Sequence, residues 1–406
     1  MSPNKIHVVG MGMNWKTLSR EYLDQVEKAD VLIGGTRYLD AFPGHPGIRI
    51  PLKGPLAGVL AKAVEAMTAG KRVAVLADGD PLFFGIGRKL IEAVGSEHVE
   101  FFPNVTALQA AAARIRIPWD RVKTVSLHGR KDLWPLLRAL VGANHVGVFT
   151  DRVNHPAAVA TELLRREVHT FRMWVFENLW QEDERIGRYE LDGLEGRSFS
   201  DLNFLILERA GSPKTRLRLG LSDDHYEHEK GLITKREIRA AGLSLLGIEP
   251  HHTVWDLGAG CGSVAIEASF LAREGAVYAV ERDPSRSRMI RANIRRTGAY
   301  TVEPVASEMP ACLDSLPDPD RVFIGGGLGQ GVDTLSEALK RLKPGGRMVL
   351  HLVLLGSLSR VKRFLEEKGC AYTVTQIQVS RSRSLAGDER LEALNPVYIL
   401  SLTKQA

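Results

Sequence analysis

The chain has 406 residues, a formal net charge of +6, and ordinary apolar (44%) and charged (25%) fractions. This length predicts two to three domains, each large enough to bury its own core. The composition is typical of a soluble globular protein. No run approaches the roughly 18 uncharged apolar residues that a membrane span needs, so no membrane partner is expected.

The three cysteines, Cys261, Cys312 and Cys370, are too few and too scattered for a disulfide framework or a zinc site. The first residues lead directly into a strand pattern without an export signal. We therefore expect a cytoplasmic protein without a metal site. The positive charge favours an acidic partner, but no basic tract with interleaved aromatic residues points to nucleic acid.

Residues 1–210 predict a first domain of the α/β class, because strand and helix patterns alternate from residue 6 to about residue 166. Three strand patterns then follow without helices between them, at 170–177, 185–191 and 203–208. These predict a second lobe with a mixed or antiparallel sheet.

Residues 211–230 are polar and charged, and we interpret them as a linker. A second domain, 231–406, begins with a helix for which Thr234 is the expected N-cap and Glu237 the capping-box partner. Strand and helix patterns then alternate to the end, which predicts a doubly wound sheet. Segments 372–380 and 397–403 predict a terminal hairpin.

A glycine-rich stretch at 253–263, Thr-Val-Trp-Asp-Leu-Gly-Ala-Gly-Cys-Gly-Ser, predicts a strand, a tight loop and a helix. Gly258, Gly260 and Gly262 allow a sharp turn and leave the N–H groups of the next helical turn facing a ligand. About 20 residues later, Glu281 ends the next strand, where its carboxylate can accept hydrogen bonds from a ribose. The pair predicts a nucleoside site.

Glycine spacing decides which nucleoside is expected. A dinucleotide loop reads Gly-x-Gly-x-x-Gly, whereas here the glycines stand at every second position and Ser263 occupies the place of the last glycine. Residues 256–262 resemble the loop of Rossmann-like S-adenosylmethionine (SAM) methyltransferases. An NAD-dependent oxidoreductase and a non-catalytic SAM-binding protein are the alternatives.

Several motifs of the first domain, taken together, resemble the tetrapyrrole methylase family. They stand at 9–12, 77–87 (with Gly-Asp-Pro at 79–81), 103–107, 127–130 and 199–203. The resemblance implies a fold of two α/β lobes with SAM folded between them. The residues it places at the SAM pocket are Gly10, Gly79, Asp80, Pro81 and Thr106.

Motifs of the second domain resemble the decarboxylating precorrin-6B C(15)-methyltransferase family. They occur in that family's order at 231–239, 255–263, 281–284, 316–320, 325–327, 342–346 and 390–398. The resemblance implies a C-terminal Rossmann-like SAM methyltransferase sheet behind the N-terminal two-lobed fold. The residues it places on SAM are Thr234, Gly258, Ala259, Gly260, Cys261, Gly262, Glu281 and Glu308.

Together the resemblances imply a bifunctional SAM-dependent enzyme of cobalamin biosynthesis. Its substrate would be an acidic tetrapyrrole, precorrin-6B or its cobalt form. The first domain would methylate carbon 5, and the second would methylate carbon 15 and remove carbon dioxide from the acetate on ring C. Because both families tend to be oligomeric, we also expect a homo-oligomer.

Catalytic residues are harder to assign from the sequence, because the macrocycle itself supplies the carbon nucleophile. His225 and His228, just before the second domain, are candidates for acid–base work. Arg381 and Arg383 are candidates for binding substrate carboxylates. For each of them the alternative is an ordinary surface or linker residue. Asn-Pro-Val-Tyr at 395–398 is similar to a motif of amino-methylating enzymes, but its position before the last strand favours a structural turn.

Overall fold

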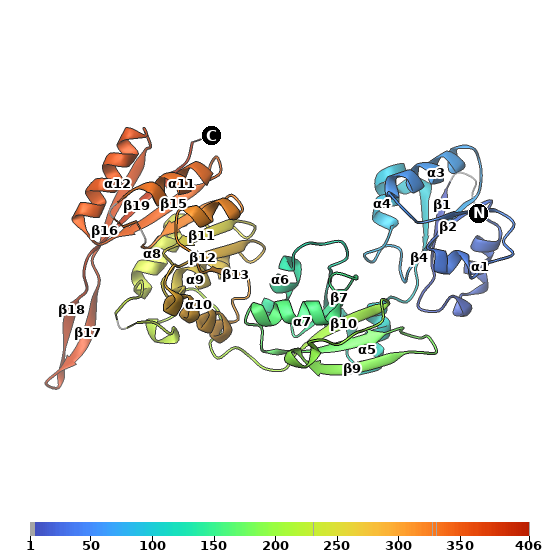
Figure 1. Ribbon diagram of the computed structural model, residues 1–406, viewed down its shortest axis with the longest axis horizontal. Helices are drawn as coiled ribbons and strands as arrows, with labels where there is room; N and C mark the ends of the chain where they lie inside the picture. Colours follow the sequence, from blue (N-terminus) through green and yellow to red (C-terminus); the bar gives the residue numbers. More distant parts are fainter. Residues whose placement is uncertain (1–4, 230, 327, 330, 406) are drawn as a thin grey trace. The chain divides into compact units, whose positions relative to one another are not determined.

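The computed structural model describes residues 5–229, 231–326, 328–329 and 331–405 (Figure 1). The first four residues and the third glycine of the 325–327 motif, Gly327, lie outside the described residues. The chain divides into two compact units. The first comprises Met1–Arg130, Asn144–Ala158 and Arg172–Glu208, and the second comprises Lys131–Ala143, Val159–Phe171 and Arg209–Ala406. No helix in the described part of the chain is long and apolar enough to cross a membrane.

The first sheet has five parallel strands in the order β3-β2-β4-β1-β5. The strands are β1 (Ile6–Gly10), β2 (Val31–Gly34), β3 (Ile48–Pro51), β4 (Val73–Ala77) and β5 (Val99–Phe102), and the helices are α1 (Arg20–Glu27), α2 (Thr36–Leu39), α3 (Leu56–Thr68) and α4 (Gly87–Val94). The inner strands β1 and β4 are buried along their whole length. Apolar side chains on both faces explain why β4 is a continuous apolar run and why β1 is apolar apart from His7.

The second sheet is mixed, with the order β6-β7-β10-β8-β9. Its strands are β6 (Lys123–Ser126), β7 (His145–Phe149), β8 (Phe171–Glu177), β9 (Arg185–Glu190) and β10 (Asn203–Arg209), and the helices of this stretch are α5 (Ala107–Ile115), α6 (Trp134–Gly142) and α7 (Pro156–Arg165). β6 and β7 are parallel, whereas β7–β10 and β8–β9 are antiparallel. The three strands predicted without intervening helices, and the mixed sheet they implied, are confirmed.

The third sheet has seven strands in the order β13-β12-β11-β14-β15-β19-β16. Its strands are β11 (Thr253–Leu257), β12 (Ala276–Val280), β13 (Val302–Val305), β14 (Arg321–Ile324), β15 (Arg347–Leu352), β16 (Tyr372–Ile377) and β19 (Val397–Thr403), and its helices are α8 (Arg236–Leu246), α9 (Ser263–Leu271), α10 (Pro284–Thr297), α11 (Asp333–Arg341) and α12 (Leu355–Glu367). The strands β13, β12, β11, β14 and β15 all run parallel to one another, and the strand order reverses between β11 and β14. This reversal is where doubly wound sheets bind ligands.

The predicted pairing of the last two strand segments is confirmed, since β16 and β19 are antiparallel. Between them the chain forms a further ribbon, β17 (Ser380–Leu385) and β18 (Asp388–Ala393), which extends beyond the end of the sheet (Figure 1). The sequence did not reveal this ribbon, because its residues are mostly charged or serine and its large apolar ones, Leu385 and Leu391, are exposed.

A buried ion pair fixes the segment before α8 to the helices of the third sheet. Glu267 on α9 and Arg239 on α8 are both fully buried, and Arg239 Nε donates to Glu267 at 2.7 Å. Glu267 also accepts from the backbone N–H groups of residues 220–221 and from the Tyr226 hydroxyl. Arg239 donates in addition to the carbonyl of Thr234 at 2.6 Å. Part of the predicted linker is therefore bonded to the second unit.

Substitution Glu267→Ala leaves the Arg239 guanidinium buried without its counter-charge, together with several unpaired donors. We expect the free energy of unfolding of this unit to fall by about 3–5 kcal/mol, measured by urea denaturation of the intact chain. The matched control is Glu337→Ala, because the partner Lys340 is largely exposed, and it should change stability by less than about 0.5 kcal/mol. Equal losses in the two variants would contradict the assignment.

Candidate functional site

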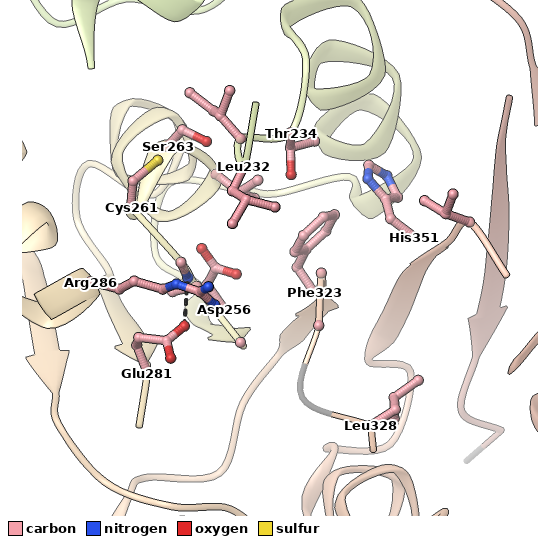
Figure 2. Close-up of a pocket in the computed structure, with 18 of the residues that line it drawn as sticks. Leu232, Thr234, Asp256, Cys261, Ser263, Glu281, Arg286, Phe323, Leu328 and His351 are labelled. Atoms are coloured by element: carbon pink, nitrogen blue, oxygen red, sulfur yellow. Dashed lines mark hydrogen bonds between the residues drawn. The ribbon is translucent and has the colours of Figure 1, made fainter. Parts of the chain in front are cut away.

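A cavity of about 840 Å³ opens in the second unit at the carboxyl ends of the third sheet's strands. Loops after β11, β12 and β14 contribute to its wall, as do the segment before α8 and the end of β15 (Figure 2). Its size is within the range of cofactor and small-molecule sites. The sheet topology thus places the cavity at the reversal of strand order.

The predicted glycine loop and the predicted acid meet in the cavity wall. Gly260 N–H donates to Glu281 Oε2 at 2.9 Å, the bond drawn in Figure 2, and Asp283 N–H donates to Glu281 Oε1 at 3.0 Å. Gly258 has φ of 73°, and a Cβ there would lie 2.6 Å from the carbonyl group of Gly326. Only glycine can therefore let the loops after β11 and β14 approach so closely.

Asp256, the fourth residue of β11, carries a carboxyl at the inner end of this wall. It is fully buried and accepts from Ala265 N–H at 2.9 Å, while its Oδ1 has no hydrogen-bond partner among the described residues. Desolvation, reinforced by the charge of Glu281, raises the pKa of Asp256 to about 7. The carboxyl is thus poised to lose its proton when a positive charge approaches.

Of the other residues predicted to contact SAM in this domain, Thr234, Ala259, Cys261 and Glu308 line the cavity, whereas Gly262 is absent from the lining. Burial raises the pKa of the Cys261 thiol, so the group stays protonated. Glu308 pairs with Arg282 at 3.2 Å on the exposed rim. The prediction of Thr234 as N-cap is wrong: α8 begins one residue later, after Lys235.

The two predicted catalytic histidines do not line this cavity. His225 shares a hydrogen bond with the Ser222 hydroxyl at 2.6 Å, and His228 Nδ1 lies 2.7 Å from the carbonyl of Glu229. Both bonds are local to the segment before α8. These bonds stabilise the local conformation of the segment.

The two predicted carboxylate-binding arginines are also absent from the lining. Arg381, on β17, binds Asp223 at 3.2 Å and Glu237 at 2.6 Å. Arg383 pairs with Glu392 across the β17–β18 ribbon. Each guanidinium is occupied by protein carboxylates, which the sequence pattern could not reveal.

Sequence reasoning missed residues on the far side of the cavity. His351 of β15 and Phe323 of β14 line it, with ring centroids 4.5 Å apart in an edge-on arrangement. Asn395, assigned to a structural turn from the sequence, also lines the cavity. The available signal was a single histidine within the apolar strand Arg-Met-Val-Leu-His-Leu.

The residues predicted at the first-domain SAM pocket are Gly10, Gly79, Asp80, Pro81 and Thr106, at or just after the carboxyl ends of β1, β4 and β5. A Cβ on Gly10 would collide with the carbonyl oxygen of Gly79, and one on Gly79 would lie 3.3 Å from Thr106 Cα. Thr106 caps α5 in a capping box with Gln109. The three loops therefore adjoin, as the resemblance implied.

The contact of Gly258 with the neighbouring loop can be tested by alanine substitution. Gly258→Ala and Gly260→Ala both force a positive φ on a side chain, costing about 1–2 kcal/mol each, but only the first meets backbone, since a Cβ on Gly260 has nothing within 4 Å. We expect Gly258→Ala to lower the free energy of unfolding by about 1–3 kcal/mol more than Gly260→Ala. Urea denaturation measures this difference, and equal losses would show that the loops are not in contact.

His351 should make stability depend on pH. Desolvation lowers its pKa from 6.5 to about 4. The unfolded chain therefore binds a proton between these values that the folded chain does not, and stability falls as pH drops through this window. Relative to His351→Leu, the wild-type chain should lose about 3 kcal/mol between pH 7 and pH 4. Parallel stability–pH curves for the two proteins would contradict this; Asp256 contributes equally to both.

Both halves of the chain match described protein families. Residues 5–195 match the tetrapyrrole (corrin/porphyrin) methylases, and residues 224–404 match the precorrin methyltransferase domain. The chain is 34% identical over 188 residues to a probable cobalt-precorrin-6B C(15)-methyltransferase (decarboxylating) of Pyrobaculum aerophilum, which covers 45% of this chain and 94% of that protein. It is 36% identical over 182 residues to a cobalt-precorrin-7 C(5)-methyltransferase of Salmonella typhimurium, with 44% and 87% covered.

A third relative spans both halves. The chain is 31% identical over 357 residues to a precorrin-6Y C(5,15)-methyltransferase (decarboxylating) of a Sinorhizobium species, which covers 85% of this chain and 82% of that protein. None of these relatives supports an NAD-dependent oxidoreductase or a non-catalytic protein. The chain therefore belongs to the family of the decarboxylating precorrin-6Y C(5,15)-methyltransferases.

Proposed function

We propose that this chain is a bifunctional enzyme that uses SAM to methylate carbons 5 and 15 of a precorrin macrocycle and that it removes carbon dioxide from the ring C acetate. The observation that carries the proposal is the bond between Gly260 N–H and Glu281 in the wall of a large cavity. A glycine loop and a ribose-binding acid in contact form a nucleoside site. We take the methyl acceptor, a precorrin macrocycle, from the names of the relatives.

In the second domain, the chain's own groups are suited to a cationic donor. When bound, SAM supplies an electrophilic methyl group. Glu281 has carboxylate oxygens beside the loop that can accept hydrogen bonds from the ribose hydroxyls. A sulfonium close to the buried Asp256 carboxyl would lower its pKa from about 7 and favour the ionised form.

We assign carbon 5 to the first domain and carbon 15 with decarboxylation to the second. Separate relatives carry names for C(5) methylation and for decarboxylating C(15) methylation, so each activity exists in a chain of its own. The adjoining loops that hold Gly10, Gly79 and Thr106 are the proposed SAM site of the first domain. Since the relatives' names include both precorrin and cobalt-precorrin, assays should include both forms of the substrate.

Calorimetry on the intact chain tests the two-site proposal, with two equivalents of SAM expected to bind. Glu281→Ala removes charge-assisted hydrogen bonds to the ribose, so affinity at one site should fall at least about 100-fold, and the apparent stoichiometry should fall to one. Mass spectrometry should then show no loss of carbon dioxide from the substrate.

The reciprocal variant is Gly10→Ala, whose methyl group collides with the Gly79 carbonyl. It should also bind one equivalent of SAM, but at the second-domain site, and it should add no methyl group at carbon 5. Two equivalents bound by Glu281→Ala, or decarboxylation by that variant, would refute the assignment.

A further inference from the structure

The cavity of the second unit extends well beyond the glycine loop. Asn395 lines it and stands two residues before β19. Because β19 runs antiparallel to β15, with Tyr398 opposite Leu352, its first residues lie at the carboxyl end of β15. In the sheet order, β19 is three strands from β11, or roughly 14 Å at the usual strand spacing. Asn395 therefore lies well away from the proposed SAM loop.

The side-chain amide of Asn395 is available to a ligand. The residue is exposed, and its amide makes no hydrogen bond within the described part of the chain. An amide has two N–H donors, so it can donate to a carboxylate without carrying a charge. The adjoining residues of the lining, Val379 and Leu394, are apolar, and Leu394 N–H donates to the Val379 carbonyl at 2.8 Å.

Lys235 brings a positive charge to the same cavity. The cationic residues that line it, among those the structure describes, are Lys235, Arg282 and Arg286. Both arginines pair with carboxylates, whereas Lys235 forms no ion pair with any described residue and donates to the carbonyl of Gly231 at 3.3 Å. Lys235 is the N-cap residue of α8, but its side chain makes no capping bond. An ammonium without a counter-charge in a cavity lining suits an anionic ligand.

The start of α8 lies beside the strand ends that carry Asn395. Glu237, in the first turn of α8, pairs with Arg381 of β17 at 2.6 Å. Arg381 stands two residues after Val379, which is bonded to the residue before Asn395. Lys235 and Asn395 therefore reach the cavity from adjoining segments, one with a charge and one with an uncharged donor.

Large apolar side chains of the lining are unusually exposed. Leu232 is 57% exposed and Val353 is 54% exposed, and both line the cavity. An exposed apolar surface beside an unpaired cation suits a ligand with an apolar ring and carboxylates at its edge. The acidic macrocycle of the proposed function has this chemistry.

We propose that Lys235 and Asn395 bind peripheral carboxylates of the macrocycle and thereby orient carbon 15 towards the methyl donor. This inference rests on the proposed function. A cation stabilises a carboxylate relative to uncharged carbon dioxide, so an ion pair opposes the loss of the group that it holds. The carboxylates bound here are therefore those that the reaction retains, and the ring C acetate lies away from Lys235.

Substitutions of Lys235 in the intact chain test the charge. We expect Lys235→Met to raise the KM for the precorrin in decarboxylation at least about 10-fold, with kcat within about three-fold and SAM affinity within about two-fold. Lys235→Arg keeps the charge and should recover most of this loss. The matched control is Arg236→Met, which removes a neighbouring positive charge outside the cavity lining and should keep the wild-type KM.

Substitution of Asn395 tests the amide. Asn395→Asp has the same shape but carries a negative charge, so it should repel a substrate carboxylate and raise the KM at least about 10-fold. The matched control is Gln376→Glu, the same chemical change at an exposed position of β16 outside the lining, which should keep the wild-type KM. Methylation at carbon 5 should be unchanged in all five variants.

An unchanged KM in Lys235→Met or in Asn395→Asp overturns the inference. An equal rise in the matched control also overturns it, because the effect would then come from the overall charge. If Lys235→Met loses SAM affinity while its KM for the precorrin is unchanged, the ammonium binds the carboxylate of SAM, and the inference is again overturned. Absence of methyl transfer by the wild-type protein would instead refute the proposed function.

Discussion

The C-terminal site depends on the ion pair between Arg239 and Glu267, because it connects two helices and the segment before them. Without it, the segment that leads to Thr234 would lose its bonds to the buried Glu267, and its remaining links to α10 would include those of Glu227 with Asn293 and of Glu229 with Arg286. With it, two charges, three backbone groups and a tyrosine hydroxyl satisfy one another in the interior. The segment that brings Thr234 to the cavity wall is therefore held by a polar network rather than by apolar packing alone.

The sheet topology determines what lies at each end of the cavity. The glycine loop follows β11, and Glu281 follows its neighbour β12, so the two are held side by side by strand pairing. His351 lies on β15, on the other side of the reversal point. The glycine loop and His351 thus lie on opposite halves of one doubly wound sheet, and the rigidity of the strands fixes their separation.

Much of this architecture could be predicted from the sequence. The alternation of strand and helix patterns indicated the α/β class of both domains, and the spacing of Gly258, Gly260 and Glu281 indicated a nucleoside site whose parts the structure brings together. Local patterns suffice here, because strand, loop and acid lie within one βαβ unit.

The far end of the cavity could not be predicted in this way. Its residues come from β14, β15 and the region around β17 and β18, which only the folded sheet brings together. The same applies to Arg381, whose sequence position suggests a free cation but whose fold places it against Asp223 and Glu237. Charge partners far apart in the chain leave no periodic signal.

The position of β19 has a consequence for biosynthesis. This strand lies between β15 and β16, although it is the last of the described strands in sequence. Until residues 397–403 leave the ribosome, the edge of β15 that faces away from β14 has no strand to pair with. The apolar side chains that β19 contributes to the core are also missing until then. The N-terminal sheets need no residue beyond 209, so a nascent chain can order them first, while the emerging C-terminal unit is exposed to aggregation and to chaperones.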